Sequence, residues 1–104
     1  MRIEILYIPG CPNFSPSLAR IRKVLRQERV SAELSEIEVK DEAAAKALHF
    51  IGSPTIRVNG LDIEFECRSI NEPAFACRRY AGGAPGEEMI RSALREARRG
   101  VKRA

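Results

Sequence analysis

The alternation of apolar and polar positions predicts a strand, a helix and a second strand in the N-terminal part of the chain. Residues 2–8 form a short, nearly continuous apolar run, which is typical of a strand buried on both faces of a sheet. Residues 15–29 carry apolar side chains at helical spacing, with Ser15 as N-cap and Pro16 at the first helical position. Residues 33–39 alternate between apolar and polar side chains, so we expect a strand parallel to the first, joined to it by a right-handed crossover.

The middle of the chain predicts a second helix and a β-hairpin. Residues 41–50 are expected to be helical, because Asp41 is a good N-cap, an alanine-rich run follows, and Gly52 is placed to end the helix. The pair Asn59-Gly60 lies between two β-rich runs within residues 55–65 and is preferred in a type I′ turn. We therefore expect these two runs to pair as antiparallel strands.

The remainder of the chain combines an irregular segment with a final helix. Residues 66–85 contain several breaking residues and predict little regular structure, apart from a short strand or turn near 76–80. Residues 86–99 carry apolar side chains at helical spacing, and Gly100 is placed to stop the helix. We expect the tail, residues 100–104, to be mobile.

Length and composition indicate a small globular protein. A chain of 104 residues with 44% hydrophobic side chains is expected to form one domain, residues 1–104, whose core needs no metal or disulfide. No apolar run approaches the roughly 20 residues of a membrane span. The apolar run at 3–8 is too short for a signal peptide. We therefore expect a cytoplasmic location, no membrane partner and no cofactor.

The formal net charge is +4, and much of the excess of arginine and lysine lies on the helices predicted at 15–29 and 86–99. Such helix faces bind nucleic acid or acidic partners in some proteins and are simply solvated in others. Aromatic residues are few and no nucleic-acid-binding motif is present. We therefore expect solvated faces and no nucleic-acid partner.

Cys11 is the first candidate for chemistry. It follows the Pro9-Gly10 turn at the end of the first strand and comes just before a helix, where open α/β sheets usually place their functional groups. Backbone N–H groups and the positive end of the helix dipole favour an anion at that point, and a thiolate is an anion. Cys11 is then either a reactive thiol or a small buried apolar side chain, and its position favours the reactive thiol.

Two further cysteines, Cys67 and Cys77, lie in the irregular segment. They could close a loop as a disulfide, or one of them could pair with Cys11, but free thiols are the default in a reducing cytosol. A metal site built from the cysteines and His49 has weak support, because no pair shows Cys-x-x-Cys spacing. We therefore expect no resident metal.

The predicted order of elements, β-α-β-α-β-β-α, and two motifs resemble the thioredoxin-like fold, particularly its glutaredoxin-sized members. Gly10-Cys11-Pro12-Asn13-Phe14 lies where that superfamily has its Cys-x-x-Cys motif, and Gly52-Ser53-Pro54-Thr55 lies where it has its cis-proline loop. Together with Cys77-Arg78-Arg79-Tyr80, these motifs resemble small bacterial thioredoxin- and glutaredoxin-like proteins. The resemblance implies an α/β fold with a four-stranded mixed sheet and helices on both faces.

The resemblance also implies roles for individual residues. Cys11 would attack a disulfide, and the backbone of Ser53, ahead of a cis Pro54, would pair with the incoming peptide or thiol. The residues implied to contact the partner are Pro12, Asn13, Phe14, Ser53, Pro54 and Thr55. An ordinary trans proline at a strand start is the alternative interpretation of Pro54.

The sequence departs from the family at position 14, where Phe14 replaces the second cysteine of the motif. Cys11 then acts alone, as in monothiol glutaredoxins, or Cys77 or Cys67 resolves its mixed disulfide, or Cys11 has lost redox activity. We expect thiol–disulfide exchange with a protein or a low-molecular-weight thiol or disulfide. The alternatives, which leave open whether the protein is an enzyme, are a redox-inactive protein-binding module and thiol-based handling of soft metal ions.

Overall fold

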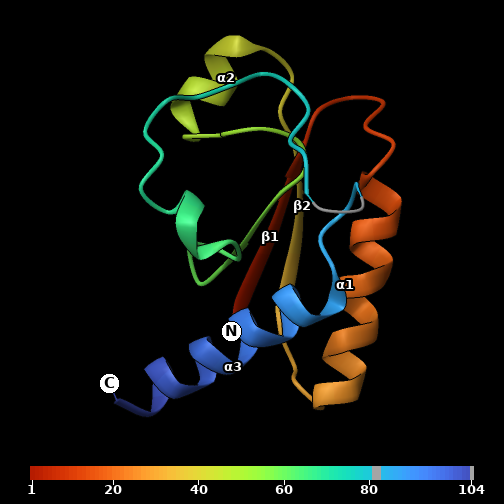
Figure 1. Cartoon of the computed structure of the whole chain (residues 1–104), viewed down its shortest axis with the longest axis vertical. Coiled ribbons are helices and arrows are strands. Elements are labelled where there is room, and N and C mark those ends of the chain that lie inside the picture. Colours follow the sequence, from red (N-terminus) through yellow and green to blue (C-terminus); the bar gives the residue numbers. More distant parts are fainter. Residues whose placement is uncertain (81–82, 104) are drawn as a thin grey trace.

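Four strands form a mixed sheet in the order β2-β1-β3-β4 (Figure 1). The computed structural model describes residues 1–80 and 83–103, with side chains in the second range as far as Gly100. The strands are β1 (Arg2–Tyr7), β2 (Glu33–Glu38), β3 (Thr55–Val58) and β4 (Leu61–Asp62). β1 pairs with β2 in parallel and with β3 in antiparallel, and β4 pairs with β3 in antiparallel.

Helices cover both faces of this sheet. They are α1 (Phe14–Glu28), α2 (Glu42–Ala47) and α3 (Glu87–Arg103), together with the short 3₁₀ helix η1 (Phe65–Cys67). Ile3 and Ile5 of β1 pack with buried side chains of α1 and α3, whereas Leu6 packs with Ala45 of α2. Successive side chains of a strand point to opposite faces, so α1 and α3 lie on one face and α2 on the other. In Figure 1, α1 lies along the sheet and α3 crosses near the N-terminus.

The predicted strand pairing is confirmed. β2 lies within the predicted strand 33–39 and runs parallel to β1. Asn59 and Gly60 have φ angles of 51° and 85°, and both central residues of a type I′ turn require positive φ. β4 is shorter than predicted, because the Asp62 carboxylate accepts a hydrogen bond from the Glu64 N–H at 2.8 Å and turns the chain away from β3. The 3₁₀ helix η1 that follows is not indicated by the sequence pattern.

α1 begins one residue earlier than predicted. Asn13 precedes the helix, and its carbonyl oxygen accepts hydrogen bonds from the N–H and the hydroxyl of Ser17, at 3.2 and 2.6 Å. The prediction that Ser15 is the N-cap is therefore wrong, and Pro16 lies within the first turn instead of at its start. Proline is tolerated there because the N–H groups of the first turn have no partner inside the helix.

α2 is shorter than predicted. Its N-cap is Asp41, as expected, with the carboxylate accepting a hydrogen bond from the Ala44 N–H at 2.8 Å. The helix ends at Ala47, so Gly52 does not end it. His49 follows with a φ of 52°, a left-handed conformation that an α-helix does not contain.

α3 is longer than predicted. It continues through Gly100 to Arg103, so the prediction that Gly100 stops the helix is wrong. A glycine inside a helix costs only about 1 kcal/mol relative to alanine, which the rest of a long helix can offset. The part of the expected tail at 100–103 is thus helical, and residue 104 lies outside the described residues. Among the described residues, no helix is both long and apolar enough to cross a membrane.

Candidate functional site

The turn that carries Cys11 is tied to the loop that carries Pro54. The Ser53 hydroxyl oxygen accepts a hydrogen bond from the Ile8 N–H at 3.0 Å, and the Ile8 carbonyl oxygen accepts one from the Cys11 N–H at 3.2 Å. Ile8 thereby connects the two loops, although 45 positions separate it from Ser53. The Ser53–Pro54 peptide bond is cis.

Cys11 lies just ahead of α1 and is partly exposed. Its carbonyl oxygen accepts a hydrogen bond from the Phe14 N–H at 3.3 Å, so Cys11 belongs to the tight turn that opens the helix. Pro12 is exposed and Asn13 is half-buried. The ring of Phe14 packs on Tyr7, with the two ring centroids 4.0 Å apart. At this turn, solvent therefore reaches Cys11 and Pro12, while an aromatic pair holds the start of the helix.

Ser53, Pro54 and Thr55 are buried, although we expected them to contact a partner. The Ser53 side chain is used by the bond from the Ile8 N–H. The Thr55 hydroxyl donates a hydrogen bond to the Gly52 carbonyl oxygen at 2.6 Å. In this structure the three residues are therefore packed inside the protein and present no surface to a partner.

A segment of the chain itself covers Ser53. We call this segment, residues 74–80, the strap. The Ser53 N–H donates to the Ala76 carbonyl oxygen, and the Arg78 N–H donates to the Ser53 carbonyl oxygen, both at 2.8 Å. Cys77 consequently lies opposite Ser53, as in a parallel ladder. Both backbone hydrogen-bonding groups of Ser53 are thus used inside the chain.

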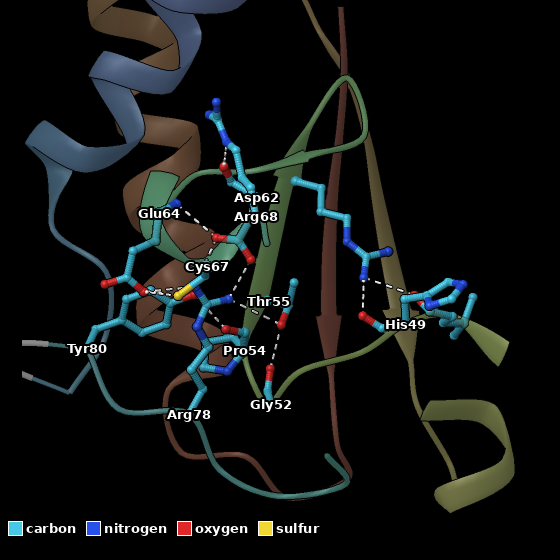
Figure 2. Close-up of polar contacts among 12 residues, drawn as sticks. His49, Gly52, Pro54, Thr55, Asp62, Glu64, Cys67, Arg68, Arg78 and Tyr80 are labelled. Atoms are coloured by element: carbon cyan, nitrogen blue, oxygen red, sulfur yellow. Dashed lines mark hydrogen bonds and ion pairs between the residues drawn. The ribbon is translucent and has the colours of Figure 1, made fainter. Parts of the chain in front are cut away.

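Arg78 fastens the strap through its buried side chain (Figure 2). The guanidinium donates two hydrogen bonds to Asp62, at 2.7 and 2.9 Å, and one to Glu64 at 2.8 Å. It also lies over the Tyr80 ring, with Cζ 4.6 Å from the ring centroid. Burial is the largest single influence and lowers the pKa of Arg78, but the hydrogen bonds to Asp62 and Glu64 and the charges around the guanidinium together outweigh it and hold this pKa above its usual range. We call Arg78, Asp62, Glu64 and Tyr80 the Arg78 clamp.

Gly52 and Tyr80 complete the attachment of the strap. A Cβ atom on Gly52 would lie 2.8 Å from the Cβ of Arg78, so only glycine lets the strap approach this closely. The Tyr80 hydroxyl donates a hydrogen bond to the Pro54 carbonyl oxygen at 2.9 Å. Burial raises the pKa of Tyr80 above its usual range, so this hydroxyl keeps its proton near neutral pH.

The three cysteines are free thiols in different surroundings. Cys77 is exposed on the strap, whereas Cys67 is half-buried in η1. The Cys67 thiol donates a hydrogen bond to the Glu64 carboxylate, with sulfur and oxygen 3.2 Å apart. Burial and this hydrogen bond raise the pKa of the Cys67 thiol. Cys67 therefore keeps its proton near neutral pH and is a weak nucleophile.

Within residues 1–80 and 83–103, no group of three or more His, Cys, Asp and Glu side chains is placed to hold a metal ion. His49, which the sequence suggested as a companion of the cysteines, follows α2. Its carbonyl oxygen accepts a hydrogen bond from Arg57 at 2.9 Å. His49 thus contributes its backbone carbonyl, just after the end of α2, to a hydrogen bond with Arg57.

Basic side chains of α1 and α3 pair with carboxylates of neighbouring elements. Lys23 lies 2.9 Å from Glu87, and Glu28 lies 3.0 Å from Arg95 and 3.5 Å from Arg91. Part of the positive charge on these two helices is therefore compensated by the protein's own carboxylates.

The sequence pattern does not predict the Arg78 clamp. The one local signal is the spacing of Asp62 and Glu64, which would place both side chains on one face of the strand expected at 61–65. Nothing local indicates that an arginine from the irregular segment will pair with them. Comparison of the chain with protein-family models, with curated proteins and with solved structures gives no match.

Proposed function

We propose that the chain has a thioredoxin-like fold and exchanges thiols and disulfides through Cys11. The observation that carries this proposal is the hydrogen bond between the Ile8 N–H and the Ser53 hydroxyl oxygen, which ties the Cys11 turn to the Ser53–Pro54 loop. The sheet order, with one parallel and two antiparallel pairs, fits the order of elements in that fold. The partner is a protein or a low-molecular-weight thiol or disulfide.

In the proposed reaction Cys11 is the nucleophile. Its thiolate sulfur attacks one sulfur of the partner disulfide and forms a mixed disulfide, while the other sulfur leaves as a thiolate and takes up a proton. A low-molecular-weight thiolate then attacks the partner sulfur and regenerates the Cys11 thiolate. Alternatively, the Cys77 thiolate attacks the Cys11 sulfur, which leaves a Cys11–Cys77 disulfide and frees the partner as a thiol.

Cys77 suits the role of second thiol better than Cys67. It is exposed, and it lies opposite Ser53, whose side chain is bonded to the turn that carries Cys11. Cys67 is held by Glu64, and its raised pKa keeps it protonated. Because Phe14 occupies position 14, no second thiol is available within residues 11–14.

The substitution Cys11→Ser tests this proposal. We expect the wild-type protein to catalyse the reduction of the mixed disulfide of glutathione and 2-mercaptoethanol by glutathione, and Cys11→Ser to lose this turnover. Cys67→Ser is the matched control and should retain it. Turnover that persists in Cys11→Ser contradicts the proposal.

One observation favours a second candidate, a redox-inactive protein-binding module. Ser53, Pro54 and Thr55 are buried, and the backbone of Ser53 is bonded within the chain. The same assay separates the candidates, since a module has no turnover in the wild-type protein.

A further inference from the structure

The strap is hydrogen-bonded to the backbone N–H and carbonyl oxygen of Ser53, the groups that the proposed function assigns to a partner. We propose that residues 74–80 are an inhibitory strap, and that a partner segment replaces it only by bringing an arginine of its own to Asp62 and Glu64. This inference rests on the single-thiol form of the proposed function. That function needs the backbone of Ser53 to receive a partner, and a partner there moves Cys77 away from its place opposite Ser53. By this inference the strap blocks the partner from the Ser53 backbone, and a segment with an arginine is able to replace the strap.

The strap is attached by backbone hydrogen bonds to Phe50 and Ser53 and by the buried side chains of Arg78 and Tyr80. Arg78 and Tyr80 are buried, whereas the exposed strap residues are Phe75, Ala76, Cys77 and Arg79. Among the described residues, neither hydrophobic core cluster includes a strap residue. Segments with few buried apolar contacts open at a lower free energy than the core does. The strap is therefore able to leave while the sheet stays folded.

Departure of the strap leaves two carboxylates without their cation. The side chains of Arg78 and Asp62 are each 7% exposed, and that of Glu64 is 28% exposed. A charge that loses its partner in such surroundings is strongly disfavoured until water or another cation reaches it. A guanidinium matches the geometry of carboxylates better than any other side chain, because it donates paired hydrogen bonds. The segment that fits is extended, because it pairs with Ser53 as the strap does, and it carries an arginine for Asp62 and Glu64.

The contacts of the strap suggest the rest of that segment. Tyr80 stands two positions after Arg78, lies beneath its guanidinium, and bonds to the Pro54 carbonyl oxygen. A tyrosine two positions after the arginine would repeat both contacts. Tyr80 also forms a bridge with Gly83, where a Cβ would lie 3.5 Å from the side-chain oxygen of Asn13. The end of the strap at Tyr80 is thus paired with a residue that lies close to Asn13, in the turn that opens α1.

A peptide-exchange assay tests the strap. The probe is a fluorescently labelled peptide with the sequence of residues 73–80 and the substitution Cys77→Ser, so that its binding involves no disulfide. We expect the full-length Arg78→Gln protein to bind this probe at least about tenfold more tightly than the wild type, because a closed strap reduces apparent affinity by the fraction of open molecules. Arg79→Gln, which changes an exposed neighbour, is the matched control and should bind like the wild type.

A second probe tests the requirement for arginine. It carries Arg78→Gln as well as Cys77→Ser, and it should bind the Arg78→Gln protein at least about tenfold more weakly than the first probe. Equal affinity of the first probe for the wild-type and Arg78→Gln proteins overturns the proposal, and so does equal affinity of the two probes for Arg78→Gln. If Arg78→Gln does not fold, Tyr80→Phe gives the same comparison, with an expected gain of about threefold for the loss of one hydrogen bond.

Alkylation of Cys11 by iodoacetamide, followed by mass spectrometry, separates this inference from the proposed function. If Cys11 of the wild type does not react while the probes bind as expected, thiol exchange is refuted, and the strap is retained only as a barrier to peptide binding at Ser53. If Cys11 reacts but the first probe does not distinguish the wild type from Arg78→Gln, the strap alone is refuted.

Discussion

Replacing Arg78 by glutamine tests how much of the stability of the fold depends on one buried cation. The side chains of Arg78 and Asp62 are each 7% exposed, and two hydrogen bonds of 2.7 and 2.9 Å join them. Removing one partner of such a pair lowers the free energy of unfolding by about 3–5 kcal/mol, because the other charge stays buried without compensation. Opening of the strap admits water to Asp62 and Glu64, so we expect the lower end of that range, about 3 kcal/mol.

Urea unfolding followed by circular dichroism measures this loss, and thermal unfolding checks it. For a domain of this size, 3 kcal/mol corresponds to a fall in Tm of roughly 12–24 °C. Arg79→Gln should stay within about 0.5 kcal/mol of the wild type, since its side chain is exposed. The double variant Asp62→Asn, Arg78→Gln should lose less than the sum of the two single losses, because the pair is broken only once. A loss in Arg78→Gln no larger than that in Arg79→Gln would refute the reasoning.

Two further predictions concern ionisable groups. At pH 8, iodoacetamide should label Cys67 more slowly than the exposed Cys77, because burial and the hydrogen bond to Glu64 raise the pKa of the Cys67 thiol. Glu64→Gln should speed the labelling of Cys67, and an unchanged rate, read by mass spectrometry, would contradict this cause. Lowering the pH from about 6 to about 3 should lower the free energy of unfolding, because hydrogen bonds from Arg78 and Arg68 lower the pKa values of Glu64 and Glu96 in the folded state. This stabilisation is complete above the usual carboxyl range and is lost as the pH falls through the lowered pKa values. Glu64→Gln should therefore flatten the pH dependence of urea unfolding, and an unchanged slope would show that Glu64 does not contribute to it.

Local patterns are sufficient for the strand pairing and for the start of α2, but not for the end of β4, the start of α1 or the ends of α2 and α3. The parallel β1–β2 pair and the hairpin at Asn59-Gly60 depend on alternation and turn chemistry, which neighbouring residues encode. The start of α1 depends instead on the Asn13 carbonyl oxygen, which accepts two hydrogen bonds from Ser17. The end of α2 depends on the left-handed conformation of His49, which its neighbours in sequence do not indicate.

The candidate site divides in the same way. Cys11 and the Ser53–Pro54 loop were recognised from motifs, and the structure ties them together through Ile8. The burial of Arg78 was not predictable, because an arginine in an irregular segment is ordinarily solvated. Its carboxylate partners lie 14 and 16 positions earlier in the chain, and its approach requires a glycine at position 52. No local pattern encodes a contact that needs three separate segments.

The bridge between Ser53 and Cys77 also bears on association between copies of the chain. Unpaired N–H and C=O groups at the border of a sheet form a template for another polypeptide. With residues 74–80 in place, the two groups of Ser53 are satisfied. Two molecules that have both released this segment are able to exchange it, because residues 74–80 of each molecule fit the unpaired Ser53 backbone of the other. The anchoring by Arg78 thus also acts against domain-swapped dimers, whose share would rise with protein concentration.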